Sequence, residues 1–288
     1  MKSALHRLLA LCLCLVLCAA LLPMPSEAVD AADTIPQLHY GNYDTLAIIS
    51  DQGSCFSMQG MTMDGTYTYC AKVNTDTDAS ACIVRTNKST GSKTVMVNSA
   101  TGGYYFTNLG HANALDTVWI GGCTQLFVTN GSTLVRLKVS GTSMTTAGTY
   151  TAKYNGSSMS MTAVQIMHAS EELVKVLVKT GCTLYTGTLN PTASSGVIEL
   201  TKLCTLNISS ARLKGEIHNF SSFLQQGMDY HDGKLFLPLS GDSQANTSVV
   251  LVYDLEGANG ELKNDPTLSF RIISSSYSAL YEIEDVCI

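Results

Sequence analysis

Short runs of β-branched and aromatic residues, separated by Gly, Asn, Asp and Ser, recur from residue 46 to the end of this 288-residue chain. Evenly spaced runs of this kind are typical of β-sandwiches, barrels and propellers. Helical periodicity is confined to a marginal stretch at residues 171–179. Charged residues make up only 14% of the chain, which argues against a coiled coil or a disordered chain. The sequence therefore predicts an all-β domain over residues 46–288.

One hairpin pattern occurs twice in the chain. Residues 59–69 are QGMTMDGTYTY and residues 226–236 are QGMDYHDGKLF. Each reads as a strand, an Asp-Gly turn and a second strand in the same register, because Asp-Gly suits the positive-φ positions of a two-residue turn. A third strand, a polar turn that finishes with Gly, and a fourth strand follow. Four antiparallel strands per repeat are the pattern of a β-propeller blade.

The spacing of the repeats predicts the number of blades. First strands start near Gln59, Asn113, Thr162, Gln226 and Glu284, at a mean interval of about 56 residues. We therefore expect a propeller of about five four-stranded blades, with an irregular sandwich or a β-helix as the alternative. The last blade is incomplete, and an incomplete blade leaves unpaired backbone groups. We therefore expect further chain after Ile288.

The N-terminus carries the features of a targeting segment. Basic residues precede an apolar run of 15 residues, and small residues follow in Ser26-Glu27-Ala28, which predicts a signal peptide over residues 1–28. The run is shorter than the roughly 20 residues of a spanning helix, so no transmembrane segment is expected. Residues 29–45 would form a lead-in to the propeller. These features predict a secreted, extracellular protein that associates with the cell envelope or is released.

Seven cysteines follow the signal peptide. Most read as small core residues, and two pairs are disulfide candidates between which the sequence does not choose, Cys182 with Cys204 and Cys70 with Cys82. None of the seven shows the spacing of a structural zinc site. The net charge is −6 without a basic cluster after residue 28, which argues against a nucleic-acid partner.

Polar residues near the starts of the first strands would converge on the axis of a propeller. The candidate ligand-binding residues are Gln59, His111, Asn113 and Gln226. Glu284 and Asn113 are the candidate metal ligands, because carboxylate and amide oxygens suit a hard cation such as Ca²⁺. The alternative is that these groups satisfy one another and channel water.

Several motifs resemble those of exported bacterial propellers with five to six blades. They are the repeated Gln-Gly-Met and Asp-Gly pattern, GHAN at 110–113, NKSTG at 87–91 and EIED at 282–285. Within that group, the chain is similar to the helveticin J-like family of secreted bacteriocins. The resemblance covers residues 29–288. It implies a secreted propeller in which more chain follows the Glu-containing strand.

No catalytic residue is assigned from the sequence. The chain has no Gly-x-Ser-x-Gly elbow, His-Glu-x-x-His helix or phosphate-binding glycine loop. This favours a non-catalytic secreted binding module for a glycan or a protein at the cell envelope. Trp119 with Tyr104 and Tyr105 would offer it a stacking platform, although aromatic residues at such positions more often pack in the core between blades. The alternative is a metal-assisted hydrolase or lactonase with a divalent cation in the central channel, and a minor one is a bacteriocin-like toxin.

Overall fold

The computed structural model describes residues 45–241, 247–272 and 282–288. All the regular elements within these ranges are β-strands, which confirms the all-β class. None of the described residues belongs to a helix with the length and hydropathy to cross a membrane. The predicted signal peptide at 1–28 lies outside the described residues, as does nearly all of the lead-in at 29–45.

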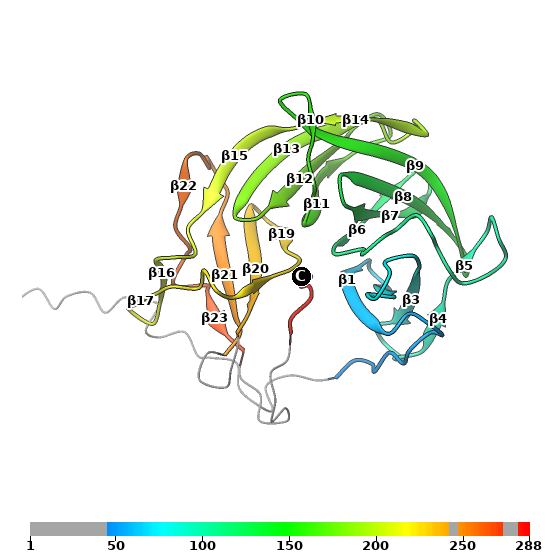
Figure 1. Ribbon diagram of the computed structural model, residues 1–288, viewed down its shortest axis with the longest axis horizontal. Helices are drawn as coiled ribbons and strands as arrows, with labels where there is room; N and C mark the ends of the chain where they lie inside the picture. Colours follow the sequence, from blue (N-terminus) through cyan, green and yellow to red (C-terminus); the bar gives the residue numbers. More distant parts are fainter. Residues whose placement is uncertain (1–44, 242–246, 273–281) are drawn as a thin grey trace, which may run out of the picture.

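Four sheets follow one another along the chain, each built on four antiparallel strands (Figure 1). The first contains β1 (Ser57–Met63), β2 (Tyr67–Val73), β3 (Ala81–Asn87) and β4 (Lys93–Val95). The second contains β6 (Leu115–Ile120), β7 (Cys123–Asn130), β8 (Thr133–Ser140) and β9 (Ser143–Tyr154). The third contains β11 (Ala163–Ala169), β12 (Val174–Thr180), β13 (Thr183–Leu189) and β15 (Thr201–Leu206). The fourth contains β19 (Asp229–His231), β20 (Lys234–Ser240), β21 (Val249–Asp254) and β23 (Phe270–Arg271).

Shorter strands extend these sheets. The strands β5 (Val97–Asn98) and β14 (Ser195–Glu199) both pair in parallel with β9, and β22 (Glu261–Leu262) pairs in parallel with β15. The others are β10 (Ser157–Ser158) on β9, β18 (Leu224–Gln225) on β20, and the ribbon of β16 (Ala211–Leu213) and β17 (Glu216–His218). Pairing of this kind covers outer edges that would otherwise expose unpaired backbone groups. The fourth strand of the third sheet is thus β15, because the preceding strand β14 joins the second sheet.

The four sheets are arranged around a common centre as the blades of a propeller are. Neighbouring first strands contact one another, β1 with β6, β6 with β11 and β11 with β19. Residues 282–288 enter this centre between the fourth sheet and the first (Figure 1). They form an extended segment, which we call the closing segment, and no strand is assigned to it. The predicted count of five blades is therefore not confirmed.

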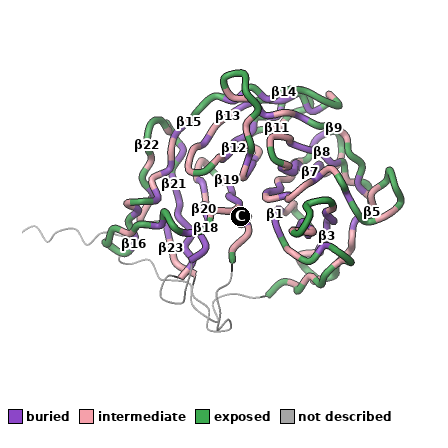
Figure 2. Tube along the Cα trace, in the orientation of Figure 1, coloured by how far each residue is buried: buried purple, intermediate pink, exposed green. Residues whose placement is uncertain are grey.

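The hydrophobic core lies mainly between adjacent sheets. One cluster joins the first sheet to the second through side chains such as Ile83, Leu115 and Leu126. A larger cluster runs from the second sheet to the fourth. Figure 2 accordingly shows buried chain along the strands and exposed chain at most of the outer turns. Each sheet is thus stabilised chiefly by its neighbours, which holds the first strands around the axis.

The two Asp-Gly turns of the repeated hairpin adopt different conformations. Asp232 and Gly233 both have positive φ, 46° and 76°, in a two-residue turn, as the sequence predicted. At Asp64 and Gly65 φ is not positive, and the loop between paired strand residues is longer. There the Asp64 carboxylate accepts the main-chain N–H groups of Thr66 and Tyr67, which replaces the tight turn.

The glycine of the repeated Gln-Gly-Met motif is required by close approach. A Cβ atom added to Gly60 would lie 2.7 Å from the Cα of Ala114, directly before β6, the first strand of the next blade. At Gly227, an added Cβ would fall within the side chain of Asp285 in the closing segment. The motif therefore marks the places where two first strands, or a first strand and the closing segment, lie too near for a side chain between them.

We expect the substitution Gly60→Ala to lower the free energy of unfolding by about 1–3 kcal/mol, because the backbone of Ala114 has to move to admit the methyl group. Gly65→Ala is the matched control, since it has ordinary φ and no atom within 4 Å of its added Cβ. That variant should stay within about 0.5 kcal/mol of the parent. Urea unfolding measures both. Equal losses in the two variants would contradict the close-approach explanation.

Candidate functional site

A cavity of about 190 Å³ lies on the axis, where the first strands meet. We call it the axial cavity. Its lining is mainly polar and includes residues from all four blades and the closing segment, among them Thr62, Asp116, Gln165, Asp229 and Ile288. A site at this position draws on strands from the whole chain, which is how a propeller brings distant residues together.

Polar side chains at matching positions of the first strands bind the next strand around the axis. The Oδ2 atom of Asp116 accepts the main-chain N–H of Ile166 in the third blade. Gln165 repeats this contact one blade further on, because its Oε1 accepts the N–H of Tyr230 at 3.4 Å and its Nε2 donates to the carbonyl of Met228 at 2.7 Å. A side chain therefore links the second blade to the third, and another links the third to the fourth.

The closing segment completes these contacts. Asp229 in the fourth blade accepts the N–H of Ile288 at 2.9 Å. Asp285 then accepts the N–H of Met61 in the first blade, also at 2.9 Å. Thr62 completes the circuit by donating to Asp116 at 3.4 Å. We call these five side chains the axial ring, which consists of Thr62, Asp116, Gln165, Asp229 and Asp285.

Burial shifts the titration of the ring carboxyls. Burial raises the pKa of Asp116 to about 7, although the N–H groups of Ile166 and Thr117 favour the ionised form. The pKa of Asp229 is also raised by burial, against two main-chain hydrogen bonds. For Asp285, burial raises the pKa well above its usual range, and the negative charges of the other two ring carboxylates raise it further. Asp116 and Asp229 line the axial cavity, whereas Asp285 does not.

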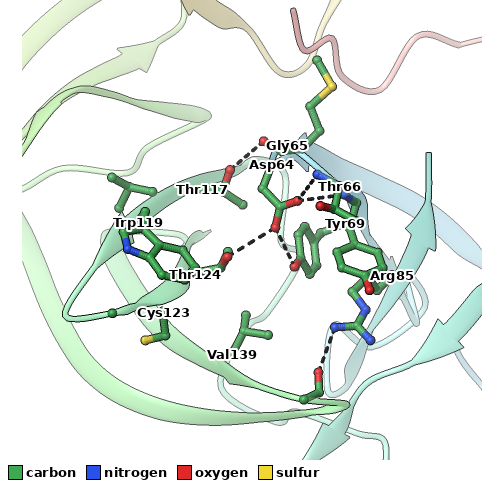
Figure 3. A pocket seen from close by; sticks show the side chains of 15 residues that line it. Asp64, Gly65, Thr66, Tyr69, Arg85, Thr117, Trp119, Cys123, Thr124 and Val139 are labelled. Carbon is green, nitrogen blue, oxygen red and sulfur yellow. Dashed lines mark hydrogen bonds between the residues drawn. The ribbon is translucent and has the colours of Figure 1, made fainter. Parts of the chain in front are cut away.

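A larger cleft of about 730 Å³ lies between the first and second blades (Figure 3). We call it the inter-blade cleft. Trp119 lies on its wall and is 70% exposed. The guanidinium of Arg85 lies 4.2 Å above the ring of Tyr67 and donates to the carbonyl of Gly141 at 2.8 Å. The cleft thus combines an uncovered indole with polar groups that have fixed orientations.

Asp64 supplies the charge of this cleft. Its carboxylate accepts the hydroxyl groups of Tyr69 at 3.0 Å and Thr124 at 3.3 Å, besides the two main-chain N–H groups of its own loop (Figure 3). Burial raises the pKa of Asp64, but the four hydrogen bonds together outweigh it and hold the pKa below its usual value. Asp64 is therefore a fixed anion.

The inter-blade cleft and the axial cavity adjoin each other. Met63 and Thr117 line both. The hydroxyl of Thr117 donates to the carbonyl of Met63 at 2.8 Å, which fixes the wall between them. A ligand held over Trp119 would therefore lie on the other side of this wall from the axial cavity.

The candidate ligand-binding residues and metal ligands predicted from the sequence line neither cavity. The Oε1 atom of Gln59 and the Oδ1 atom of Asn113 are buried without a hydrogen-bond partner among the described residues. His111 bonds Asp78 at 2.8 Å on the surface. Gln226 donates to Glu282 at 2.7 Å. The structure therefore does not join these residues into one site.

The predicted calcium ligands stay a prediction. Burial and the charge of Glu282 raise the pKa of Glu284 to about 7. Across residues 45–241, 247–272 and 282–288, no three His, Cys, Asp or Glu side chains are grouped so that they could hold a metal ion. We therefore assign no step of the chemistry to a metal at Glu284 and Asn113.

Sequence reasoning missed the ring carboxyls, although a signal was present. Aligning the first strands on Gln59, Asn113 and Gln226 places Thr62, Asp116 and Asp229 three residues further along. The interpretation considered the starts of the strands rather than this repeated polar position. Trp119 was identified as a possible platform and does line the cleft, whereas Tyr104 and Tyr105 do not line it.

Comparisons with known proteins find similar solved structures but no similar sequence. No protein-family model matches it, and no curated protein matches its sequence. Among solved structures, it is similar to the GH43 protein BlXynB from Bacillus licheniformis at 12% identity and a TM-score of 0.42, over 75% of this chain and 43% of that one. It is also similar to the xyloglucan PUL protein GH43B from Bacteroides ovatus at 8% identity and a TM-score of 0.36, over 70% of this chain and 40% of that one.

These findings correct one prediction and leave others open. The chain spans less than half the length of either similar structure. Both carry the name GH43, and the prediction of a non-catalytic binding module is wrong against that finding. Membership of the helveticin J-like family, export and the cell-envelope location stay predictions.

The raised pKa of Asp116 makes stability depend on pH. A carboxyl whose pKa is higher in the folded than in the unfolded chain stabilises the fold while protonated, so this stability is lost as pH rises from about 4 to about 7. Asp116→Asn removes that titrating group, and we expect the variant to lose less stability than the parent between pH 5 and pH 8. Asp232→Asn, at an exposed turn that asparagine also tolerates, should follow the parent. Urea unfolding at both pH values tests this, and a parallel pH dependence in Asp116→Asn would contradict it.

Proposed function

We propose that this protein hydrolyses glycosidic bonds, with its reaction centre in the axial cavity and its glycan held in the inter-blade cleft. The observation that carries the proposal is the pair Asp116 and Asp229, two carboxyl groups with raised pKa values in one polar cavity. Glycoside hydrolysis generally uses two carboxyl groups, one protonated and one ionised, on either side of the bond that breaks.

The two carboxyl groups would have different roles because their surroundings differ. With a pKa of about 7, Asp116 retains a proton near neutral pH and is the general acid. Asp229 receives the N–H of Ile288, which favours its ionised form, and is the general base. In the reaction, Asp116 gives its proton to the glycosidic oxygen as the bond to the anomeric carbon breaks. Asp229 takes a proton from the water molecule that attacks that carbon.

The inter-blade cleft has the composition that a sugar ligand requires. The apolar face of a sugar ring stacks on an exposed indole, and its hydroxyl groups need polar partners around the rim. Trp119 offers the indole, while Asp64 and Arg85 offer an acceptor and donors. The negative charge of Asp64 and the positive charge of Arg85 cancel, so the cleft suits an uncharged glycan better than a polyanion.

Substituting the ring carboxyls tests the reaction. We expect Asp116→Asn and Asp229→Asn each to lower kcat by roughly 100-fold or more, because asparagine can accept the main-chain N–H but cannot carry the proton. Activity of the parent should fall above about pH 7, as Asp116 loses its proton. The measurement is the release of reducing ends from soluble polysaccharides, together with 4-nitrophenol from aryl glycosides.

Asp285→Asn is the matched control. Asp285 makes the same kind of main-chain contact but does not line the axial cavity. This variant should keep its kcat once its folding has been checked by circular dichroism. A folded parent that cleaves none of these substrates, or a kcat that survives in Asp116→Asn, would contradict the proposed function.

Trp119 should determine affinity rather than turnover. We expect Trp119→Ala to raise KM by about five- to tenfold with little change in kcat, because stacking on the indole is lost while the axial carboxyls stay in place. Tyr104→Ala is the control, since Tyr104 is also an exposed aromatic residue but lies outside the cleft. Equal effects of the two substitutions on KM would place the glycan elsewhere.

A further inference from the structure

A cysteine in the chain that precedes β1 packs against a cysteine in β3. Cys55 and Cys82 are both completely buried, and together with Val84 they form a small core cluster of their own. The Cys55 side chain lies close enough to the thiol of Cys82 to raise the pKa of that thiol. The Sγ atom of Cys55 also lies 3.5 Å from the carbonyl oxygen of Ser80, two residues before Cys82. The two cysteine side chains therefore pack next to each other in this cluster.

Main-chain contacts fix this approach independently of the thiols. Cys55 and Gln52 exchange two main-chain hydrogen bonds of 2.9 and 3.0 Å. The next residue, Phe56, donates its N–H to the carbonyl of Val73 at 3.1 Å. Val73 pairs with Ala81, which directly precedes Cys82 in β3. The segment that carries Cys55 is thus held against the first blade on both sides of the cysteine.

Strand register disfavours the two disulfides considered from the sequence. Cys70 lies opposite Val84, and Cys82 lies opposite Lys72, so Cys70 and Cys82 are diagonal neighbours. Diagonal neighbours are roughly 7–8 Å apart, beyond the usual Cα separation of a disulfide. Cys204 lies opposite Leu184, which places Cys182 in a diagonal position as well.

The surroundings protect the cysteine pair once the blade has formed. Burial raises the pKa of Cys82 to about 12, with the neighbouring Cys55 contributing, so the folded protein holds an unreactive thiol there. The ammonium of Lys72, which bonds Asp51 at 2.7 Å, partly offsets this effect. Because only thiolates attack disulfides, oxidation has to occur while the first blade is still forming, and the product is then shielded from reductants.

We propose that Cys55 and Cys82 form a disulfide bond when the chain folds in the presence of a disulfide oxidant, such as oxidised glutathione or a thiol oxidoreductase. One cysteine thiolate attacks the oxidant's disulfide, which forms a mixed disulfide and releases the first thiolate of the oxidant. The second cysteine thiolate then attacks the cysteine sulfur of this mixed disulfide and releases the oxidant's other thiolate. Two protons and two electrons leave the cysteines, and the oxidant is reduced to two thiols. The bond ties the chain before β1 to β3 without displacing the strands.

Peptide mapping tests the proposal directly. The full chain is refolded in a buffer of oxidised and reduced glutathione, its free thiols are alkylated in denaturant, and it is cleaved before aspartate. This cleavage separates Cys55, in residues 51–63, from Cys70, in residues 64–75, and from Cys82, in residues 78–115. We expect peptides 51–63 and 78–115 to be joined, and to separate on reduction. Recovery of both with alkylated or glutathionylated cysteines, or a link to residues 64–75, would overturn the proposal.

Stability measurements give a second readout. In oxidised protein, Cys55→Ala and Cys82→Ala should each lower Tm by about 5–10 °C more than they do in reduced protein. Cys70→Ala, the matched control on the same face of the sheet, should lower Tm equally in both states. A Tm of the parent that does not change on reduction would count against the bond.

Discussion

The first strands of this fold depend on side chains that accept main-chain N–H groups from the next strand around the axis. First strands of neighbouring blades contact one another without forming a continuous ladder, so N–H groups near the axis need another acceptor. Asp116 and Asp229 provide it in two places, and Asp285 provides it where the closing segment meets the first blade. The closing segment is therefore bonded on both sides, to the fourth blade and to the first.

The contacts between first strands leave little space for side chains at the axis, whereas the outer edges of the blades accommodate additional chain. At the centre, Gly60 and Gly227 are needed because the neighbouring chain leaves no room for a Cβ. At the rim, connecting chain is long enough to add parallel strands to β9 and β15. The buried guanidinium of Arg136 secures one such connection by donating to the carbonyl of Ala193 at 3.1 Å, just before β14, and to Gln125 at 2.7 Å. The long mean interval between repeats reflects this extra chain.

The sequence was informative where a local pattern has a local cause. The strands of the four sheets and the two-residue turn at Asp232 follow from alternation and turn chemistry, whereas the strand predicted at Glu284 is an extended segment. The blade count depended on the closing segment, whose long-range contacts leave no periodic pattern. His111 illustrates the difficulty for the site: its place near the start of a first strand suggested the axis, but its partner is Asp78, in the β2–β3 loop. The position of a residue within a repeat predicts how far along the propeller axis the residue lies. It does not predict the direction in which the side chain points.

The proposed reaction and the closure of the fold both depend on carboxyl groups that are buried next to the axis. A carboxyl group that binds N–H groups next to the axis has to be buried there, and burial alone raises its pKa. The hydrogen bonds it receives act in the opposite direction, and for Asp116 burial prevails. A fold that uses aspartates to join its first strands thereby produces carboxyl groups with raised pKa values. Two of them, Asp116 and Asp229, line the axial cavity, whereas Asp285 does not. The substitution Asp116→Asn separates the two roles of Asp116, because asparagine still accepts the N–H of Ile166 but cannot supply the proton that the proposed reaction needs.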